Sequence, residues 1–229
     1  MSDKSAGPTS AARPEPLGLA PAASGRRLLL ATRAHHKARE LQELLDLPGV
    51  VLLTPDEVGI DGAPVEDADS FHGNAEIKVR YYALHSGLPT LADDSGLEVD
   101  ALDGRPGVYT RRYAGPDATD ADNNARLLAE LDGLAPEQRG ARYQCVLAYL
   151  DPVMGHHAVP VFREGTFEGR IATVPRGDGG FGYDPIFEPF SEPPGVRTVG
   201  QMSAAEKHAL SHRGKAARAM AEYLRAEGW

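Results

Sequence analysis

The chain of 229 residues predicts an α/β fold, because short apolar runs typical of strands are mixed throughout with segments that have helical spacing. Residues 1–25 are rich in Pro, Ala, Ser and Gly and predict a disordered tail, without the continuous apolar stretch of a signal peptide. Residues 26–229 are long enough to form one domain with a sizeable core, and they contain no internal repeat.

The first half of this domain alternates strand and helix. The apolar run Arg27–Thr32 predicts a buried first strand, and the leucines that follow at helical spacing predict a helix that Pro48–Gly49 ends. Val50–Thr54 predicts a second strand. Ser70–His85 has the pattern of a second helix, which a glycine and a proline stop, and Leu88–Ala92 predicts a third, buried strand.

The second half begins with a Gly- and Pro-rich loop over residues 103–118. A helix is expected over Thr119–Leu131, because a Thr and an Asp at its start form a capping pair. Ala141–Leu150 and Ala158–Thr173 predict a β-hairpin. A capping box opens a final helix, which we expect to run from Ser203 to about Ala226 without a break.

Composition restricts the class of partner. The formal net charge of −9 argues against nucleic acid or an anionic membrane, although a site can still gather positive charge for a small anionic substrate. No apolar run approaches the length that spans a membrane. The single cysteine, Cys145, excludes an internal disulfide and a Cys-based metal site, and predicts a cytoplasmic protein with a buried thiol.

The most informative segment is Leu91–Asp100, in which an apolar run leads directly into two aspartates, a serine and a glycine. It predicts a buried strand that ends at a site. Because Asp93 and Asp94 repel each other, a hard divalent cation with oxygen ligands would explain the pair. A solvated turn, which Asp-Ser-Gly also favours, explains this segment equally well.

The turn Thr32–Lys37 joins the first strand to the first helix. Backbone N–H groups at a helix start, a threonine hydroxyl and a lysine suit a phosphate, but the turn contains no glycine and is not a Walker loop. A plain capped helix explains the spacing better. The pairs His35–His36 and His156–His157 are more typical of solvated histidines than of metal ligands, because neither has a partner at metal-binding spacing.

Two later segments suit a nucleotide. The loop Pro175–Pro185 holds four glycines, which permit close approach of a ligand, and two aromatic residues that can stack on a base or pack into the core. Lys207 and Ser211 share a helix face with cationic residues beyond them. Together with the phosphate turn and the aspartate pair, these segments predict a nucleoside triphosphate site with Mg²⁺.

Five motifs then occur in order: ATxxxxKxxEL at Ala31–Leu41, FxxNAxxK at Phe71–Lys78, LADDSGLxVDALxGxPGVYxxRYAG at Leu91–Gly115, GGFGYDPIF at Gly179–Phe187 and EKxxxSHRGKA at Glu206–Ala216. With these motifs the chain, from about Arg27 to its end, resembles the inosine triphosphate pyrophosphatase family. The resemblance implies an elongated mixed sheet with flanking helices, two lobes around a central nucleotide cleft, and a homodimer.

The resemblance also implies hydrolysis of ITP, dITP and XTP to the monophosphate and pyrophosphate with Mg²⁺. It implies catalysis by Asp94, metal binding by Glu66, Asp93 and Asp94, and stacking of the purine on Phe181. Phosphates or other parts of the nucleotide would contact Thr32, Lys37, Lys78, Ser95, Gly182, Tyr183, Asp184, Lys207, His212 and Arg213.

Three departures from the family pattern bear on activity. Ala34 stands where the family normally has asparagine, Gly73 where it commonly has glutamate, and Thr110–Arg111 where it has a serine–alanine pair. Losing a hydrogen bond to a charged group costs about 1.5–3 kcal/mol, so we expect an active enzyme with weakened phosphate binding. The alternatives are a related pyrophosphatase for other modified nucleotides and a catalytically weakened nucleotide-binding protein.

Overall fold

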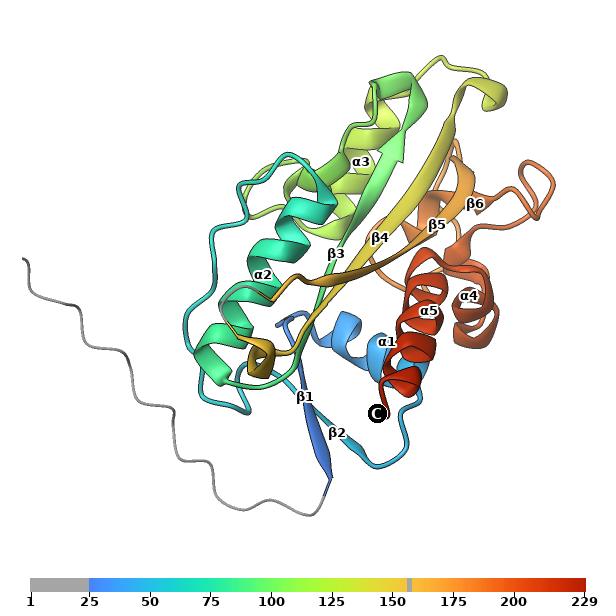
Figure 1. Ribbon diagram of the computed structural model, residues 1–229. Coiled ribbons are helices and arrows are strands. Elements are labelled where there is room, and N and C mark those ends of the chain that lie inside the picture. Colours follow the sequence, from blue (N-terminus) through green and yellow to red (C-terminus); the bar gives the residue numbers. More distant parts are fainter. Residues whose placement is uncertain (1–24, 156–157) are drawn as a thin grey trace, which may run out of the picture.

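The described part of the chain is one mixed sheet with helices on both faces. The computed structural model describes residues 25–155 and 158–229, so the predicted tail, apart from its last residue, and the pair His156–His157 lie outside the described residues. The sheet has six strands in the order β2-β1-β3-β4-β5-β6 (Figure 1). The strands are β1 (Arg26–Leu30), β2 (Val50–Leu53), β3 (Thr90–Val99), β4 (Gly140–Leu150), β5 (Val161–Ile171) and β6 (Phe187–Pro189).

Strand β1 pairs in parallel with β2 and β3, and all later pairs are antiparallel, which confirms the predicted α/β class with a mixed sheet. The α-helices of the described residues are α1 (His35–Leu45), α2 (Phe71–Ser86), α3 (Asp120–Glu130), α4 (Ala204–Leu210) and α5 (His212–Ala226). None of the helices in the described ranges combines the length and apolar character needed to cross a membrane.

Strand alternation divides the apolar side chains among three cores. Leu28 and Leu30 face the core shared with α1 and α5, whereas Leu29 between them faces the core shared with α2. A third core lies at the far end of β3 and β4, where Leu97 packs in the same cluster as Leu127 of α3. The elongated sheet in Figure 1 thus joins two ends with separate cores, in agreement with the expected two lobes.

The expectation that the third strand ends at Ala92 is wrong, because β3 continues through the aspartate pair to Val99. Asp93 lies opposite Leu147 and Asp94 opposite Val146 in an unbroken antiparallel ladder with β4. This pairing outweighs the low strand propensity of Asp, Ser and Gly.

The final helix is also not continuous, as we had expected, but breaks at Ser211 into α4 and α5. Ser211 has extended backbone angles, and its Oγ accepts the N–H of Gly214 at 3.0 Å, which caps α5. A side chain at Gly214 would lie 2.1 Å from the carbonyl oxygen of His208, so only glycine permits this tight corner between the two helices.

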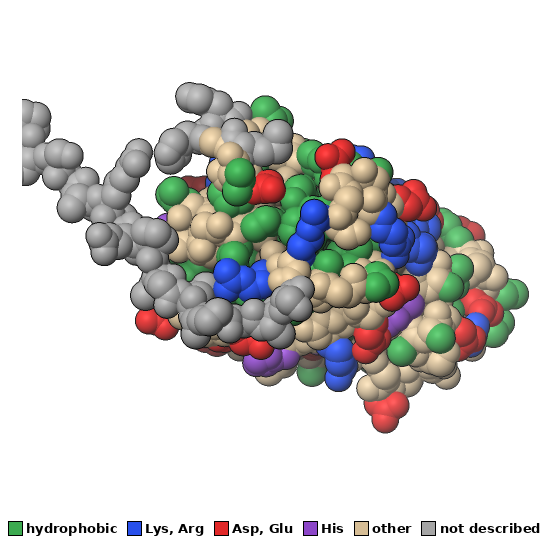
Figure 2. Space-filling view, turned by 60° about the horizontal axis from the view of Figure 1, so that its bottom comes forward, with side chains coloured by type: hydrophobic (Ala, Val, Ile, Leu, Met, Phe, Trp, Pro, Cys, Tyr) green, Lys and Arg blue, Asp and Glu red, His purple; other side chains and the backbone are tan. Residues whose placement is uncertain are grey.

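The remaining predicted elements are confirmed with small shifts in their ends. Strands β4 and β5 form the antiparallel pair of the predicted hairpin, and α3 begins with the capping box of Thr119 and Asp122. Cys145 is fully buried, as expected. Figure 2 shows that acidic, basic and apolar side chains are interspersed over one face of the molecule, so on that face the positive charge is not gathered into one large area.

Helix α5 packs directly on β5 at Gly165, which provides a test of the fold. A Cβ atom at Gly165 would lie 2.1 Å from the carbonyl oxygen of His212, so the start of α5 would have to move. We expect Gly165→Ala to lower the free energy of unfolding by about 1–3 kcal/mol, measured by urea denaturation. Glu164→Ala, at its exposed neighbour, serves as the control, and equal midpoints for the two variants would contradict this packing.

Candidate active site

The site lies where β3 has an open edge. Strand β1 pairs with β3 only at Thr90 and Leu91, after which the chain leaves the sheet through the turn Thr32–Lys37. From Asp93 to Leu97 β3 therefore has no strand neighbour on this side among the described residues, although β4 continues on the other side, and at Glu98 β3 bridges to Pro106. Asp93, at the start of this open stretch, contacts Lys37 of the predicted phosphate turn.

On one side of the sheet Asp94 meets Lys78 of α2. The Lys78 ammonium lies 2.6 Å from Asp94 Oδ1 and 2.9 Å from Glu66 Oε2, and it donates to the carbonyl oxygen of Asp93 at 2.8 Å. Asn74, one turn earlier on α2, accepts the N–H of Ala68 at 3.1 Å and so holds the segment that carries Glu66. Gly73 allows this segment to approach, because a Cβ there would lie 2.6 Å from that of Ala68.

Burial and the neighbouring charges shift the pKa values of Asp94 and Lys78 in opposite directions. Burial raises the pKa of Asp94 even though Lys78 opposes the rise. Burial disfavours the charge of Lys78, but Asp94 and Glu66 outweigh it and raise the pKa of Lys78, so the ammonium stays protonated. A carboxylate with a raised pKa is a stronger proton acceptor, which suits a general base.

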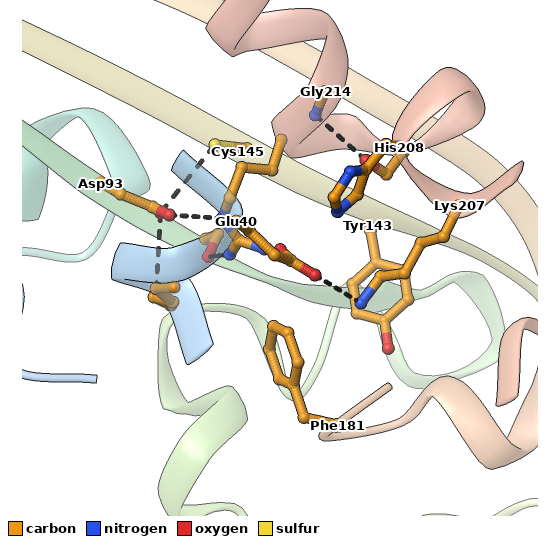
Figure 3. Close-up of polar contacts among 12 residues, drawn as sticks. Glu40, Asp93, Tyr143, Cys145, Phe181, Lys207, His208 and Gly214 are labelled. Carbon is orange, nitrogen blue, oxygen red and sulfur yellow. Dashed lines mark hydrogen bonds and ion pairs between the residues drawn. The ribbon is translucent and has the colours of Figure 1, made fainter. Parts of the chain in front are cut away.

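Asp93 projects from the other side of the sheet, as strand alternation requires. Its carboxylate has no exposed surface and accepts hydrogen bonds from Arg213 Nε at 2.6 Å and Lys37 Nζ at 3.4 Å. The Cys145 sulfur lies 3.9 Å away (Figure 3). Of the three residues expected to hold a metal, the structure therefore brings Glu66 and Asp94 together at Lys78, whereas Asp93 lies on the other side of the strand with its oxygens bound by Arg213 and Lys37.

Arg213 binds three different elements at the start of α5. Besides Asp93, its guanidinium donates to Glu40 Oε2 at 2.6 Å and to Ser95 Oγ at 2.8 Å. Burial opposes the charge, but Asp93 outweighs it and raises the pKa of Arg213 above its ordinary value. Three acceptors hold Arg213 in place, and its guanidinium carbon lies 5.7 Å from the centre of the Phe181 ring, so Arg213 stands near the position expected for the base.

Glu40 joins Arg213 to Lys207, and the sequence analysis had not singled it out. Glu40 Oε1 lies 2.9 Å from the Lys207 ammonium (Figure 3). The same ammonium lies 2.8 Å from Asp184 Oδ2. Although Glu40 is part of the first motif, only its position one turn after Lys37 on α1 could have indicated a role. The ion pairs connect α1, α4 and the glycine loop.

The predicted phosphate turn leads into a helix without a side-chain cap. Ala34 is the N-cap residue of α1, and no side chain accepts the first N–H groups of that helix. Thr32 Oγ1 accepts the N–H of Ala34 at 3.2 Å and so shapes the turn. The alternative of a plain capped helix is therefore not observed, and the N–H groups of the first turn remain suited to an anion.

The glycine loop places its two aromatic residues differently. Phe181 is only half-buried, and the Lys207 ammonium lies 4.2 Å from the centre of its ring. Tyr183 is buried in the core and donates its hydroxyl to the carbonyl oxygen of Thr110 at 2.8 Å. Of the two, only Phe181 is therefore placed to stack on a base. Asp184 Oδ2 accepts the N–H of Phe181 at 2.9 Å and fixes the loop.

Helix α3 holds the same loop from the other side. Asp120 Oδ2 accepts the N–H of Gly182 at 2.6 Å, and Asn124 donates to the carbonyl oxygen of Gly182 at 3.1 Å. The two side chains stand one turn apart on α3, so both polar atoms of one loop residue are bound by a single helix face. The sequence analysis missed this pair, for which helical spacing was the only signal.

His212 is buried against Tyr143. The two rings stack with centroids 4.7 Å apart and planes only 7° from parallel. Burial lowers the pKa of His212 well below its ordinary value, so the ring is neutral. Its Nδ1 atom is buried and has no hydrogen-bond partner among the described residues. His212 therefore has an uncommitted polar atom in the site.

The pairing of Asp93 with Arg213 leads to a prediction about stability. Asp93→Asn leaves a buried guanidinium with fewer negative partners, so we expect the free energy of unfolding to fall by about 3–5 kcal/mol. Asp56→Asn is the control, because Asp56 pairs with Arg33 at the surface and such pairs contribute at most about 1 kcal/mol. Urea denaturation at neutral pH measures both, and equal losses would contradict a structural role for Asp93.

The difference in the free energy of unfolding between the wild type and Asp93→Asn depends on pH. Although burial favours the neutral acid, Arg213 and Lys37 hold the pKa of Asp93 well below its ordinary value of 3.8. A carboxyl whose pKa is lowered by folding contributes stability above its unfolded pKa and loses it as the pH falls below that value. The difference between wild type and Asp93→Asn should therefore shrink when denaturation is repeated below about pH 4.

Comparison with known proteins agrees with this arrangement. Residues 28–223 match the model of the Ham1 family. A protein of Thioalkalivibrio sulfidiphilus named dITP/XTP pyrophosphatase is 47% identical over 201 residues, which cover 86% of this chain and 98% of that protein.

Solved structures agree as well. A HAM1 protein from Coxiella burnetii superposes with a TM-score of 0.78 at 39% identity and covers 88% of this chain and 99% of that one. A nucleoside-triphosphatase, or dITP/XTP pyrophosphatase, from Mycobacterium abscessus gives 0.69 at 41% identity, covering 86% and 98%. The family model spans most of the chain and the relatives match along nearly their whole length, so this protein belongs to the Ham1 family.

Proposed function

We propose that this protein hydrolyses non-standard purine nucleoside triphosphates, namely dITP, ITP and XTP, to the nucleoside monophosphate and pyrophosphate. The relatives named dITP/XTP pyrophosphatase support this substrate class. The observation in the structure that carries the proposal is the contact between Asp94 and Lys78 at the open edge of β3. It places a proton acceptor of raised pKa beside a fixed positive charge.

The triphosphate is proposed to lie along the open edge of β3, facing the turn Thr32–Lys37. The uncapped N–H groups of α1 and the Lys37 ammonium provide positive charge at one side of that edge, and Lys78 provides it at the other. Ala34 supplies no side-chain hydrogen bond in this turn, so backbone N–H groups take a larger part in phosphate binding than in a chain with asparagine there.

The carboxylates of Glu66 and Asp94 suit Mg²⁺. Both belong to the oxygen donors that this ion prefers, and both lie within 3 Å of the same ammonium group. No group of three or more His, Cys, Asp or Glu side chains forms a complete metal cage within residues 25–155 and 158–229. Mg²⁺ commonly binds through one or two carboxylates together with substrate phosphates, so Glu66 and Asp94 would hold it when bound, and it would neutralise phosphate charge.

The reaction requires water to attack the α-phosphorus on the side opposite the leaving pyrophosphate. Asp94 Oδ1 is bound by Lys78, whereas Oδ2 accepts no hydrogen bond from the described residues and is free to take the proton of the attacking water. The bond between the α-phosphorus and the bridging oxygen breaks, and the electron pair leaves with pyrophosphate. Lys78 stays protonated throughout and offsets negative charge in the transition state.

The base is proposed to stack on Phe181, beside Lys207. Hypoxanthine and xanthine carry a 6-keto acceptor where adenine carries an amino donor, so a hydrogen-bond donor at this point discriminates between them. The Nδ1 atom of His212 is buried without a partner among the described residues and is the candidate donor in its neutral N–H form. On the family resemblance alone, we further propose a homodimer that works in the cytoplasm.

The first experiment measures pyrophosphate release from dITP, ITP, XTP, ATP and GTP with Mg²⁺ at mildly alkaline pH. We expect rapid release from the first three and slow release from ATP and GTP. Asp94→Asn should lower kcat by about 10²–10⁴-fold, because a general base contributes by about that factor. Asp117→Asn, at an exposed position, is the matched control.

Absence of release from every purine triphosphate by the wild-type protein would contradict the proposal. Nucleotide binding without cleavage would instead support the catalytically weakened binding protein considered from the sequence. Preferential cleavage of modified pyrimidine nucleotides would support the related pyrophosphatase.

A second prediction concerns the base. Phe181→Ala removes the stacking surface, and stacking of a base on an aromatic ring is worth about 1–3 kcal/mol. We expect KM for dITP and XTP to rise about five- to 100-fold with a smaller change in kcat, because the ring does not touch the reacting phosphate. Phe181→Tyr keeps the ring and should retain a near wild-type KM. An equal rise in both variants would argue against stacking.

A further inference from the structure

The stacking surface of Phe181 already has a partner within the chain, the imidazole of His36. The centroids of the two rings lie 4.0 Å apart, with an angle of 40° between their planes. His36 belongs to the first turn of α1, directly before Lys37, whereas Phe181 belongs to the glycine loop. A contact between the phosphate turn and the base loop therefore exists before any nucleotide is bound.

Three groups approach the Phe181 ring, and two of them are fixed by ion pairs. The Arg213 guanidinium carbon lies 5.7 Å from the ring centre, and Arg213 is held by Asp93 and Glu40. Lys207 is buried and is fixed by ion pairs with Glu40 and Asp184 at 2.9 and 2.8 Å. His36 is exposed, and its ring makes no hydrogen bond or ion pair with the described residues. A purine that stacks on Phe181 would have to break two buried ion pairs to move Lys207, but it breaks only one ring contact to move His36.

We propose that His36 occupies the base-stacking position on Phe181 in the nucleotide-free protein and is displaced when the purine binds. The proposal rests on the function proposed above and adds a residue that sets the KM of that reaction. His36 acts as an internal competitor for the ring. It is a positioning residue of the free protein, because the stacked complex no longer contains its contact with Phe181.

The charges around His36 indicate what the displacement costs. The partial desolvation of the exposed His36 ring, then Lys37 and Arg213, lower its pKa, whereas Asp120 and Glu40 act in the opposite sense. The ring is therefore neutral at neutral and alkaline pH, and the interaction lost on displacement is the contact between two uncharged rings tilted by 40° to each other. Such a pair is worth about 0.5–1.5 kcal/mol, which is small enough for a purine to replace it.

An internal competitor has a distinct kinetic signature. It weakens the binding of every purine by the same factor, because the cost is paid in the free protein and does not depend on the incoming base. It leaves kcat unchanged, because the contact is absent once the substrate is bound. We therefore expect His36→Ala to lower KM by about two- to tenfold for dITP, XTP and GTP alike.

The experiment compares three variants. His36→Ala removes the competing ring, and His36→Phe keeps an aromatic competitor and should have a KM at or above that of the wild type. His85→Ala is the matched control, because His85 stacks on Tyr81 at the same centroid distance of 4.0 Å at the far end of α2. In addition, His36→Ala should have no effect on KM in a Phe181→Ala background, since the competed surface is then missing.

Binding of the product gives a readout that does not depend on turnover. Inosine monophosphate is titrated into the protein, with calorimetry for its Kd and nuclear magnetic resonance of labelled histidine for the ring of His36. We expect His36→Ala to lower Kd by the same factor as KM. The His36 resonances of the wild-type protein should move toward the positions of a solvated histidine as the ligand saturates.

An unchanged or raised KM in His36→Ala would overturn the proposal, and a raised value would make His36 a second stacking partner of the base. His36 resonances that do not move at saturation would overturn it as well. These failures differ from a failure of the proposed function, because in both cases the wild-type protein still releases pyrophosphate normally.

Discussion

The buried guanidinium of Arg213 is the group on which the rest of the site depends. It joins α5 to Asp93 on β3, to Glu40 on α1 and to Ser95, and these contacts bring segments far apart in the sequence to one place. A planar fork with five donors can satisfy three acceptors at once, which an ammonium group cannot do in the same geometry. A buried charge must be paired, so the arginine fixes the positions of its partners as much as they fix its own.

Because side chains alternate along β3, the two adjacent aspartates face opposite sides of the sheet and have different roles. Asp93 turns toward Arg213 and carries no exposed surface, whereas Asp94 turns toward Lys78 and the α2 side of the sheet. The repulsion between the two neighbouring carboxylates is therefore offset without a metal ion shared between them, because each carboxylate has its own cation. Asp93 holds the strand in place, and Asp94, whose pKa burial raises in the protein without metal or nucleotide, is the proton acceptor proposed for the reaction.

The helices and strands that have a local signal in the sequence could be predicted from it. Apolar runs predicted β1 to β5 but not the short β6, and the capping residues Thr119 and Ser203 predicted two helix starts. The break at Ser211 and the extension of β3 through Asp93 did not follow, because both depend on contacts with distant segments, namely the packing of α5 and the ladder with β4. The motifs supplied most site residues, but not their partners. The roles of Glu40, Asp120 and Asn124 arise only when α1 and α3 meet other elements.

Charge balance explains why a triphosphate would need a cation in addition to the protein. The site holds five carboxylates against four cationic side chains, and the cations already neutralise carboxylates of the same site (Glu40, Glu66, Asp93, Asp94 and Asp184; Lys37, Lys78, Lys207 and Arg213). These ion pairs keep every buried charge satisfied before the nucleotide arrives. A triphosphate then adds further negative charge to a site with no positive excess, so a divalent ion held by Glu66 and Asp94 is the arrangement that the electrostatics favour.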